Sequence, residues 1–341
     1  MRHVLVARLD SAGDVLLTGP AVRAVAAGAD KVTFLAGPRG VAAARLLPEV
    51  DEVIEFHAGW VDFDAPPVTA DAVDGLLAAI RAAAPTAALV FTSFHQSPLP
   101  LALLLRMAGV GWIAAISTDY PGSLLDVRYP VDEDQPEQLR NLALAEAAGF
   151  AGTSTRLRIR ENLLPDVTAL TGGPGYIVVH PGAAVPARRP STARTKAHVA
   201  ALVRAGHRVL VTGGPDEDTA LVADGLATDL GGRTDLATLA AVLRGAEVVV
   251  APNTGPAHLA VAVGTPVVSL FAPVVPARRW APYGVPVVVL GRRTAPCAGT
   301  RARRCPVPGH PCLDDITSAE VVDAVERLRA GRSCLETRCP A

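Results

Sequence analysis

The chain has 341 residues, of which 50% are hydrophobic and only 4% are aromatic, so its core must be built mainly from Ala, Val and Leu. A formal net charge of -1 gives no general attraction to nucleic acid or to an acidic partner. The sequence lacks the roughly 20 consecutive apolar residues of a membrane helix and opens without the regions of a signal peptide. We therefore expect a cytoplasmic protein with at most peripheral membrane contact.

The first part of the chain alternates between apolar runs and helical patterns. Strands are predicted over residues 3–8, 31–36, 52–56, 88–92 and 112–116. Helices are predicted over residues 15–27, 41–47, 70–83, 99–108 and 138–148. Residues 118–135 contain scattered Pro, Gly and Asp and are predicted to form a long loop. This alternation predicts a doubly wound α/β domain with a parallel sheet over residues 1–160.

An irregular segment, residues 150–174, is predicted to link this domain to a second one. Strands are then predicted over residues 176–179, 208–212, 246–251, 266–270 and 285–290. Helices are predicted over residues 195–205, 217–227, 236–243 and 257–263. We place the second doubly wound domain at 170–315, a C-terminal amphipathic helix within 316–330, and a tail at 331–341. Two such domains facing a cleft suit a reaction between two substrates.

A polar turn joins the strand predicted over 246–251 to the next helix, and it consists of Asn253, Thr254, Gly255 and Pro256. Asn or Thr can cap a helix, Gly permits close backbone approach, and Pro suits a first turn. The free N–H groups of that turn suit a phosphate, and His258 lies in the same turn. We predict an anion-binding site here, with an ordinary capped helix as the alternative.

Two further loops lie at the same predicted edge of the second domain. Arg188 and Arg189 stand in a Pro-bounded loop, and a guanidinium group binds phosphate oxygens in two-pronged fashion. The alternative is a solvent-exposed pair of arginines. Gly213 and Gly214 follow a strand and would let a flat base or a sugar approach the backbone, although this composition is common in α/β loops.

Asp10 and Asp14 follow the first strand, at the predicted ligand edge of the first domain. Gly13 is predicted to turn the backbone sharply and so to push the Asp14 carboxylate toward a ligand. Such a carboxylate could take a proton from an acceptor hydroxyl, or it could simply cap the following helix. The loop lacks G-x-G-x-x-G, which argues against an NAD-dependent oxidoreductase.

No metal is predicted. The acidic triplets at 62–64, 132–134 and 216–218 mimic the D-x-D of other sugar transferases, but the acid content of the chain produces such triplets by chance. Cys297, Cys305 and Cys312 are too widely spaced for a C-x-x-C zinc site, so we predict free or partly buried thiols over a three-Cys metal site. Cys334 and Cys339 are predicted to lie in a loose tail. The basic segment 292–304 lacks aromatic residues and is predicted to be solvated, with a loop that contacts an anionic acceptor as the alternative.

Several of these motifs occur together, in the same order, in one known family. The opening R-L-D-S-A-G-D-V-L-L-T-G-P-A from Arg8 resembles the R-L-D-x-x-G-D-V start of family 9 glycosyltransferases, the ADP-heptose:lipopolysaccharide heptosyltransferases and their relatives. His180-Pro181-Gly182-Ala183 resembles their second-domain P-G-A loop. T-G-P-A-H-L-A from Thr254, followed by Gly264-Thr265-Pro266, resembles their donor-site signature. W-A-P-Y-G from Trp280 and C-L-D-D-I from Cys312 fit the closing segments.

The resemblance implies a GT-B fold, which has two Rossmann-like domains with the donor nucleotide in the C-terminal one. It implies the transfer of a sugar from an ADP-sugar, with inversion at the anomeric centre and without a metal ion or a cofactor. In the family the transferred sugar is heptose. Asp14 falls on the proposed general base. Thr254, Gly255 and His258 fall on donor contacts.

The sequence departs from the family pattern at two places. The basic residue of the second-domain loop is usually a Lys before x-W-P, but here the loop reads Ala187-Arg188-Arg189-Pro190, so Arg188 is our choice and Arg189 the alternative. Asn253 replaces the usual Asp and keeps hydrogen bonding without the charge. The acceptor, a cell-envelope glycan or a small molecule, is not identified. A GT-B nucleotide-sugar epimerase and a non-catalytic ADP-sugar-binding protein are the alternative functions.

Overall fold

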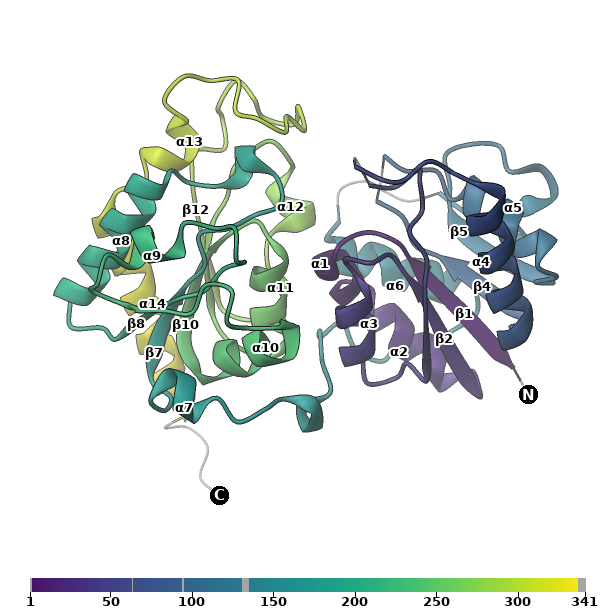
Figure 1. Ribbon diagram of the computed structural model, residues 1–341, viewed down its shortest axis with the longest axis horizontal. Coiled ribbons are helices and arrows are strands. Elements are labelled where there is room, and N and C mark those ends of the chain that lie inside the picture. The colour runs from purple at the N-terminus through teal and green to yellow at the C-terminus, as the bar shows by residue number, and fades with distance from the viewer. Residues whose placement is uncertain (1, 63, 94, 131–134, 337–341) are drawn as a thin grey trace. The chain divides into compact units, whose positions relative to one another are not determined.

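The computed structural model describes residues 2–62, 64–93, 95–130 and 135–336, without the side chains of 332–336. The acidic triplet at 132–134 and Cys339 therefore lie outside the described residues. The chain forms two compact units, Met1–Arg160 and Glu161–Ala341 (Figure 1). Each unit is built around its own sheet of six parallel strands.

In the first unit the strand order is β3-β2-β1-β4-β5-β6. The strands are β1 (His3–Arg8), β2 (Lys31–Ala36), β3 (Glu52–Glu55), β4 (Ala87–Val90), β5 (Trp112–Ile116) and β6 (Val127–Tyr129). The helices are α1 (Ala12–Leu16), α2 (Gly19–Ala27), α3 (Val41–Leu46), α4 (Ala70–Ala83), α5 (Leu99–Met107) and α6 (Glu137–Ala147). Helices α2 and α6 contact each other on one face of the sheet, and α4 and α5 on the other (Figure 1).

In the second unit the order is β12-β11-β10-β7-β8-β9. The strands are β7 (Tyr176–Val179), β8 (Val209–Val211), β9 (Thr228–Asp229), β10 (Ala246–Pro252), β11 (Val267–Leu270) and β12 (Val287–Leu290). The helices are α7 (Thr168–Thr171), α8 (Thr192–Arg204), α9 (Thr219–Ala223), α10 (Leu236–Gly245), α11 (Gly255–Ala262), α12 (Ala277–Trp280), α13 (Pro311–Asp314) and α14 (Ser318–Glu336). Helices α8 and α14 contact each other on one face, and α10 and α11 on the other (Figure 1).

The two sheets share one topology. Numbered from its own first strand, each has the order 3-2-1-4-5-6, the order of the dinucleotide-binding Rossmann fold. The direction of winding reverses between β1 and β4 in the first unit, and between β7 and β10 in the second. Ligands of open α/β sheets bind beyond the carboxyl ends of the strands at this switch point.

The strands are apolar on both faces because helices cover both faces of each sheet. Leu5, Leu35 and Ile80 are fully buried in the core of the first unit. Val179 and Leu202 are equally buried in the second unit, whose core also includes Cys297 and Cys312. In the described part of the chain, no helix has the length and apolar character needed to cross a membrane.

The strong apolar runs gave correct predictions: β1, β2, β5, β7 and α4 have the predicted bounds. The errors fall on short or polar elements. The loop predicted over 118–135 contains a 3-10 turn, Gly122–Leu124, and the three-residue edge strand β6, which pairs with β5 through its backbone. The two-residue β9 was missed, and α9 is much shorter than the predicted helix 217–227. Helix α14 continues to Glu336, so residues 331–336, with Cys334, are helical and not tail.

Candidate active site

A buried arginine organises the ligand edge of the first unit. Arg8 ends β1 and is completely buried. Its Nε lies 2.7 Å from Asp10 Oδ2, while Nη2 and Nη1 each lie 3.2 Å from a carboxylate oxygen, of Asp14 and Glu137 respectively. Burial opposes the guanidinium charge, but these three carboxylates together hold the pKa of Arg8 above its usual value. One cation thus gathers acidic side chains from the β1 loop, α1 and α6.

Asp14 lies in the first turn of α1, and this overturns the sharp turn predicted at Gly13. The Ser11 hydroxyl donates to Asp14 Oδ2 over 2.6 Å, and the Ser11 N–H donates to the same oxygen over 3.3 Å. These two bonds from Ser11 accompany the start of the helix at Ala12, and Gly13 has no positive φ. The other carboxylate oxygen faces Arg8, yet the Asp14 side chain remains 18% exposed. The carboxylate therefore combines the capping interaction with access to solvent.

Asp10 is the more enclosed of the two aspartates. Its Oδ1 accepts a hydrogen bond from Gln96 Nε2, and its Oδ2 accepts one from the Ser93 hydroxyl at 3.3 Å. Burial raises the pKa of Asp10, although the nearby Arg8 acts in the opposite direction. Ser93 and Gln96 follow β4, the strand beside β1 at the switch point.

Four residues of this cluster were not predicted from the sequence. They are Ser93, Gln96, Glu137 and Arg140. The last two are bonded to each other, with Arg140 Nη1 2.9 Å from Glu137 Oε1, and Arg140 also donates to the Thr92 carbonyl. The sequence could have indicated Ser93 and Gln96 as site residues, because both follow a predicted strand. Nothing in the local sequence places Glu137 beside Arg8, from which it is separated by 129 residues.

The corresponding edge of the second unit is the start of α11. Thr254 is the N-cap residue, and within the described ranges its hydroxyl makes no capping hydrogen bond. Gly255 and Pro256 form the first turn, and His258 is buried just behind them. Asn253 is only 4% exposed, and its Nδ2 finds no acceptor among the described residues. A buried amide donor in that state calls for an acceptor from outside the protein.

The neighbouring strand β7 is followed by a histidine that is held neutral. His180 Nδ1 lies 3.1 Å from Thr212 Oγ1. Burial lowers the pKa of His180 to about 4, against the opposing influence of Glu217, so the ring is uncharged at neutral pH. Glu217 Oε2 accepts a hydrogen bond of 2.9 Å from the Gly214 N–H. The two-glycine turn therefore positions a carboxylate that the sequence analysis had assigned only to a chance triplet.

The glycines of this edge make room for that carboxylate. A Cβ added to Gly182 would lie 1.9 Å from Glu217 Oε1, and one added to Gly213 would lie 2.8 Å from Glu217 Oε2. Of the two candidate arginines, Arg189 donates through Nε to the Ala183 carbonyl and so ties down its own loop. Arg188 ends the 3-10 turn Pro186–Arg188.

Cys297 and Cys312 belong to the core of the second unit, whereas Cys305 is only partly buried. Cys297, Cys305 and Cys312 are free thiols, as the spacing predicted. Burial raises the pKa of Cys312 to about 12, and the neighbouring Cys297 and Cys305 add to the effect. Over the residues described here, no three His, Cys, Asp or Glu side chains are arranged to hold a metal ion.

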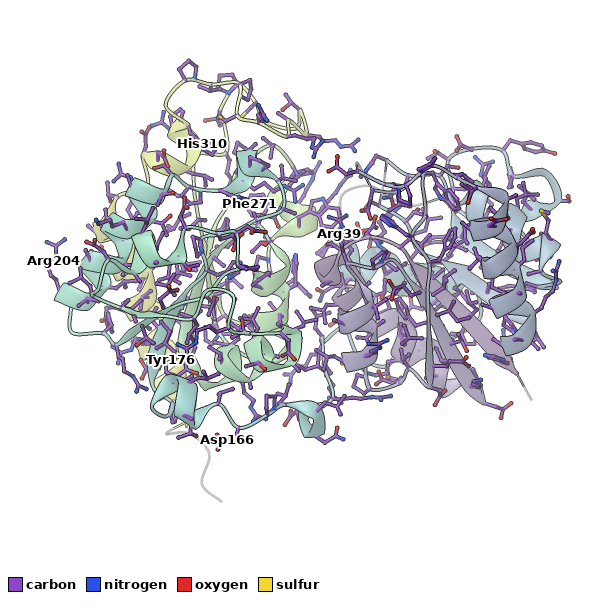
Figure 2. All side chains as sticks on the ribbon, in the orientation of Figure 1. Arg39, Asp166, Tyr176, Arg204, Phe271 and His310 are labelled. Atoms are coloured by element: carbon purple, nitrogen blue, oxygen red, sulfur yellow. The ribbon has the colours of Figure 1, made fainter. Side chains whose placement is uncertain are left out.

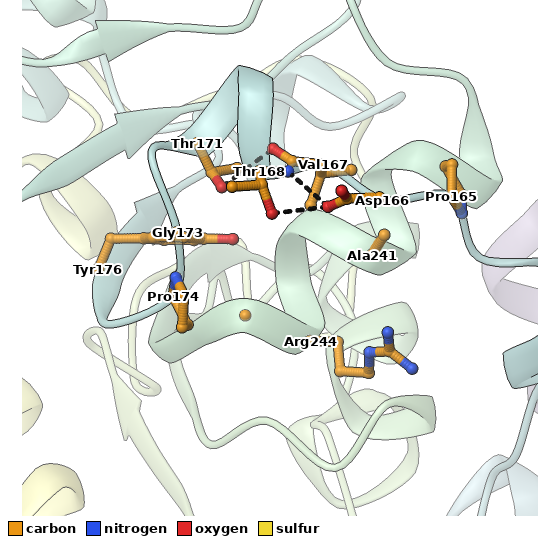
Figure 3. Close-up of a pocket in the computed structure, with 11 residues that line it drawn as sticks. Pro165, Asp166, Val167, Thr168, Thr171, Gly173, Pro174, Tyr176, Ala241 and Arg244 are labelled. Carbon is orange, nitrogen blue, oxygen red and sulfur yellow. Dashed lines mark hydrogen bonds between the residues drawn. The ribbon is translucent and has the colours of Figure 1, made fainter.

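A cavity of about 250 Å³ lies at the amino ends of β7 and β10, opposite the edge just described (Figure 3). Tyr176 and Arg244 line it, together with the start of α7. Its polar groups already have protein partners: Asp166 accepts from Thr168, and the Tyr176 hydroxyl donates to the Val242 carbonyl over 2.7 Å. This cavity therefore contributes nothing to the candidate site.

Comparison with known proteins assigns the chain to a family. The family model for glycosyltransferase family 9 (heptosyltransferase) matches residues 89–310. The chain belongs to glycosyltransferase family 9. A curated relative, lipopolysaccharide heptosyltransferase 3 of Escherichia coli, is 32% identical over 107 residues, which are 29% of this chain and 32% of the relative. That alignment thus spans about a third of the relative's length.

Solved structures agree with the GT-B fold expected of a family 9 protein. A glycosyl transferase family 9 structure from Veillonella parvula superposes with a TM-score of 0.76, at 19% identity, over 97% of both chains. The structure of Escherichia coli ADP-heptose lps heptosyltransferase II superposes with a TM-score of 0.75, at 20% identity, over 98% of this chain and 100% of the other. Two parallel-sheet α/β domains are common to all three structures.

The site residues predicted for this family 9 chain fall into two groups. In the first unit, Asp10, Gly13 and Asp14 lie at the end of β1. In the second unit, the predicted residues lie after β7, β8 and β10, and they are Arg188, Arg189, Gly213, Gly214, Asn253, Thr254, Gly255, Pro256 and His258. Asp10 and Asn253 follow the switch-point strands β1 and β10, whereas Gly213 and Gly214 follow the neighbouring strand β8.

Proposed function

We propose that this protein transfers a sugar, heptose first among the candidates, from an ADP-sugar to a hydroxyl group of a glycan or small-molecule acceptor. The transfer inverts the anomeric centre and needs neither a metal ion nor a cofactor. The observation that carries this proposal is the buried Asn253 amide at the start of α11, whose Nδ2 has no acceptor among the described residues. The Escherichia coli structural relative is an ADP-heptose lps heptosyltransferase, which supports the choice of donor.

In this proposal the donor diphosphate binds at the first turn of α11. The N-terminal N–H groups of the helix and the Asn253 amide donate to its oxygens, and Arg188 neutralises part of its charge. The His180 ring next to this edge is neutral, so it adds no charge to the proposed diphosphate site. As the bond to the sugar breaks, the same donors stabilise the ADP that leaves.

The first unit supplies the base. The Asp14 carboxylate takes the proton of the acceptor hydroxyl, whose oxygen attacks the anomeric carbon of the donor sugar. The bond between that carbon and the diphosphate oxygen breaks, and its electron pair leaves with ADP. Ser11 and Arg8 fix the two oxygens of Asp14, so the carboxylate is oriented before the acceptor arrives.

The donor half of this proposal is tested by calorimetric titration of the full chain with ADP, UDP and GDP, first without metal and then with Mg²⁺. We expect selective binding of ADP that does not depend on Mg²⁺. Asn253→Ala and Arg188→Ala are each expected to weaken it about tenfold, because each removes a charge-assisted hydrogen bond. Arg204→Ala, at the exposed end of α8 (Figure 2), is the matched control and should bind ADP as the wild type does. Absence of nucleotide binding, or equal weakening by Arg204→Ala, contradicts the assignment.

A further inference from the structure

Glu137 is the most enclosed carboxylate of the cluster around Arg8. Its side chain is 1% exposed, against 9% for Asp10 and 18% for Asp14. Acidic side chains are almost never buried to this degree unless they are paired. Glu137 lies in the first turn of α6, where an acid also stabilises the helix dipole, but that role requires neither burial nor a contact with β1. The burial of Glu137 therefore points to a role within the cluster.

Glu137 and Asp14 hold opposite ends of one guanidinium group. Arg8 Nη1 donates to Glu137 Oε1 over 3.2 Å, which is its only hydrogen bond within the described residues. Arg8 Nη2 donates to Asp14 Oδ1 over 3.2 Å and to the Ser93 hydroxyl over 2.9 Å. Arg8 Nε lies close to Asp10, but its N–H is not aimed at an acceptor among the residues that the structure describes. Because the guanidinium group is planar, the bond to Glu137 helps to set the direction of Nη2.

Helix α6 presents Glu137 to Arg8 from a fixed position. Arg140 Nη1 donates to the same oxygen, Glu137 Oε1, over 2.9 Å, and to the Thr92 carbonyl over 2.7 Å. Further along the helix, Asn141 Nδ2 donates over 3.1 Å to the carbonyl of Leu17, the C-cap residue of α1. These bonds tie α6 to the end of β4 and to α1 without the help of Arg8.

Other charged groups also lie on the elements around Asp14. In chain order these elements carry Arg8, Asp10, Arg39, Arg45, His95, Glu137 and Arg140. Arg39, Arg45 and His95 are exposed, so water and salt screen their charges. Burial raises the pKa of Asp10, so Asp10 is the group that can gain or lose a proton when the charge around it changes. The remaining charges near Asp14, apart from Arg8, are those of α6.

We propose that Glu137 is a positioning residue for Asp14 and acts on it through Arg8. Glu137 directs Nη2 toward Asp14, and its charge offsets part of the Arg8 charge that would otherwise make Asp14 a weaker proton acceptor. The proposal rests on the role of Asp14 in the glycosyl transfer proposed above. Arg140 limits the effect, because it bonds to the same oxygen of Glu137. The cluster thereby fixes the Asp14 carboxylate without removing its affinity for a proton.

Two substitutions on α6 have expected effects of opposite sign. Glu137→Gln keeps the shape and removes a negative charge, so the Asp14 carboxyl should lose its proton about one pH unit lower than in the wild type. Arg140→Gln removes a positive charge, so the midpoint should rise. The midpoint is read from the carboxyl carbon NMR signal of Asp14 in the full chain without ligand, assigned by its loss in Asp14→Asn. Shifts of the same sign, or no shift in either variant, overturn the proposal.

Three further variants separate charge from packing. Asn141→Ala is the structural control, because Asn141 ties α6 to α1 and does not bond to Arg8. It should lower the stability of the first unit and leave the Asp14 midpoint unchanged. Glu137→Asp keeps the charge and should bring the midpoint back toward the wild-type value. In an Asp10→Asn background Asp10 cannot compensate, so the two opposite shifts should persist there. A midpoint that moves as far in Asn141→Ala as in Glu137→Gln overturns the proposal.

ADP release from ADP-heptose, followed on the same samples, separates this inference from the proposed function. Glu137→Gln should lower the rate at neutral pH by about threefold to tenfold, because a base that binds its proton less tightly is a weaker catalyst. If Asp14→Asn releases ADP as fast as the wild type, the assignment of Asp14 as base fails, and the positioning role for that base fails with it, whatever the midpoints show. If the rate depends on Asp14 but the opposite midpoint shifts are absent, the role of Glu137 alone is overturned.

Discussion

The two units have the same strand order but opposite electrostatic designs at their switch points. The first unit buries full charges there, with Arg8 enclosed by three carboxylates. The second unit buries uncharged groups, the neutral ring of His180 and the amide of Asn253, next to the start of a helix. The two edges therefore do not differ in fold. They differ in the residues that follow the two central strands of each sheet.

Each design suits one half of a transfer reaction. The Asp14 carboxylate, fixed by Arg8 and Ser11, is oriented as a base must be. Uncharged donors at a helix start bind an anion through their dipoles, with Arg188 as the proposed counter-charge. Damage to one edge should therefore leave the function of the other intact, and this separation can be tested in several ways.

The largest effect is expected from Asp14→Asn, which removes the proposed base and keeps the shape of the side chain. The turnover number should fall by about 10²–10⁴, the usual contribution of a general base. ADP affinity, which belongs to the second unit, should not change. Steady-state transfer and calorimetry on the same sample check both halves.

Ser11→Ala is the control for the helix-capping role of Asp14. It removes the 2.6 Å bond to Asp14 Oδ2 but leaves the carboxylate. We expect a loss of about 1 kcal/mol in the free energy of unfolding and a much smaller loss of rate. Equal loss of rate in both variants would mean that Asp14 acts only through the helix.

A large loss of stability is expected from Arg8→Met, and only in the first unit. The substitution leaves three carboxylates in a buried cluster without their shared cation. Breaking a buried pair in this way costs about 3–5 kcal/mol. Hydrogen exchange resolved by peptide should show faster exchange in β1 and β4, with β7 and β10 unchanged. Uniform acceleration across both sheets would show that the units do not unfold independently.

How much of this structure the sequence predicts depends on how far apart in the chain the interacting residues lie. The apolar runs that become β1 or β7 are local patterns, and their bounds were predicted correctly. The edge strand β6 could not be predicted, because it exists through backbone pairing with β5 and not through its own composition. Strand order in each sheet likewise depends on packing between distant segments.

The same reasoning applies to the candidate site. Asp10, Asp14 and the 253–258 segment were predicted because they follow apolar strands and carry recognisable local chemistry. Glu137 was missed because only the folded chain brings it to Arg8. The role assigned to Gly13 was wrong because a bond between Ser11 and Asp14 starts the helix early. Local patterns therefore found the edges, and tertiary contacts decided how the side chains at those edges are held.

Acid should act in opposite directions through the buried His180 and His198 of the second unit and the buried Asp10 of the first. Burial lowers the pKa of His180 and of His198 to about 4, so the unfolded chain binds protons more readily than the folded one below about pH 6.5. The stability of the second unit should therefore fall as the pH drops from about 6.5 to about 4, by at most about 3 kcal/mol per histidine. Asp10 has the opposite effect on stability. Its pKa is raised in the folded chain, so acidification favours the folded form through that group.

Urea unfolding between pH 4 and pH 7, followed by hydrogen exchange, measures this contrast. His198→Asn is the informative variant, because His198 lies on α8, bonded to Ser318, and away from the candidate site. It should flatten the pH dependence of the second unit and leave that of the first unit unchanged. An unaltered slope in the variant would show that His198 titrates normally in the folded state.

The smallest effect concerns the placement of Glu217. Gly182→Ala should cost about 1–2 kcal/mol in unfolding free energy, because the new Cβ displaces the Glu217 carboxylate from its bond to the Gly214 N–H. In a Glu217→Ala background the same substitution should cost almost nothing, and the double-mutant cycle measures that coupling. Gly214→Ala is the control, since a Cβ there meets no described atom within 4 Å. Additive effects of Gly182→Ala and Glu217→Ala would show that a contact other than that with the Glu217 carboxylate requires the glycine.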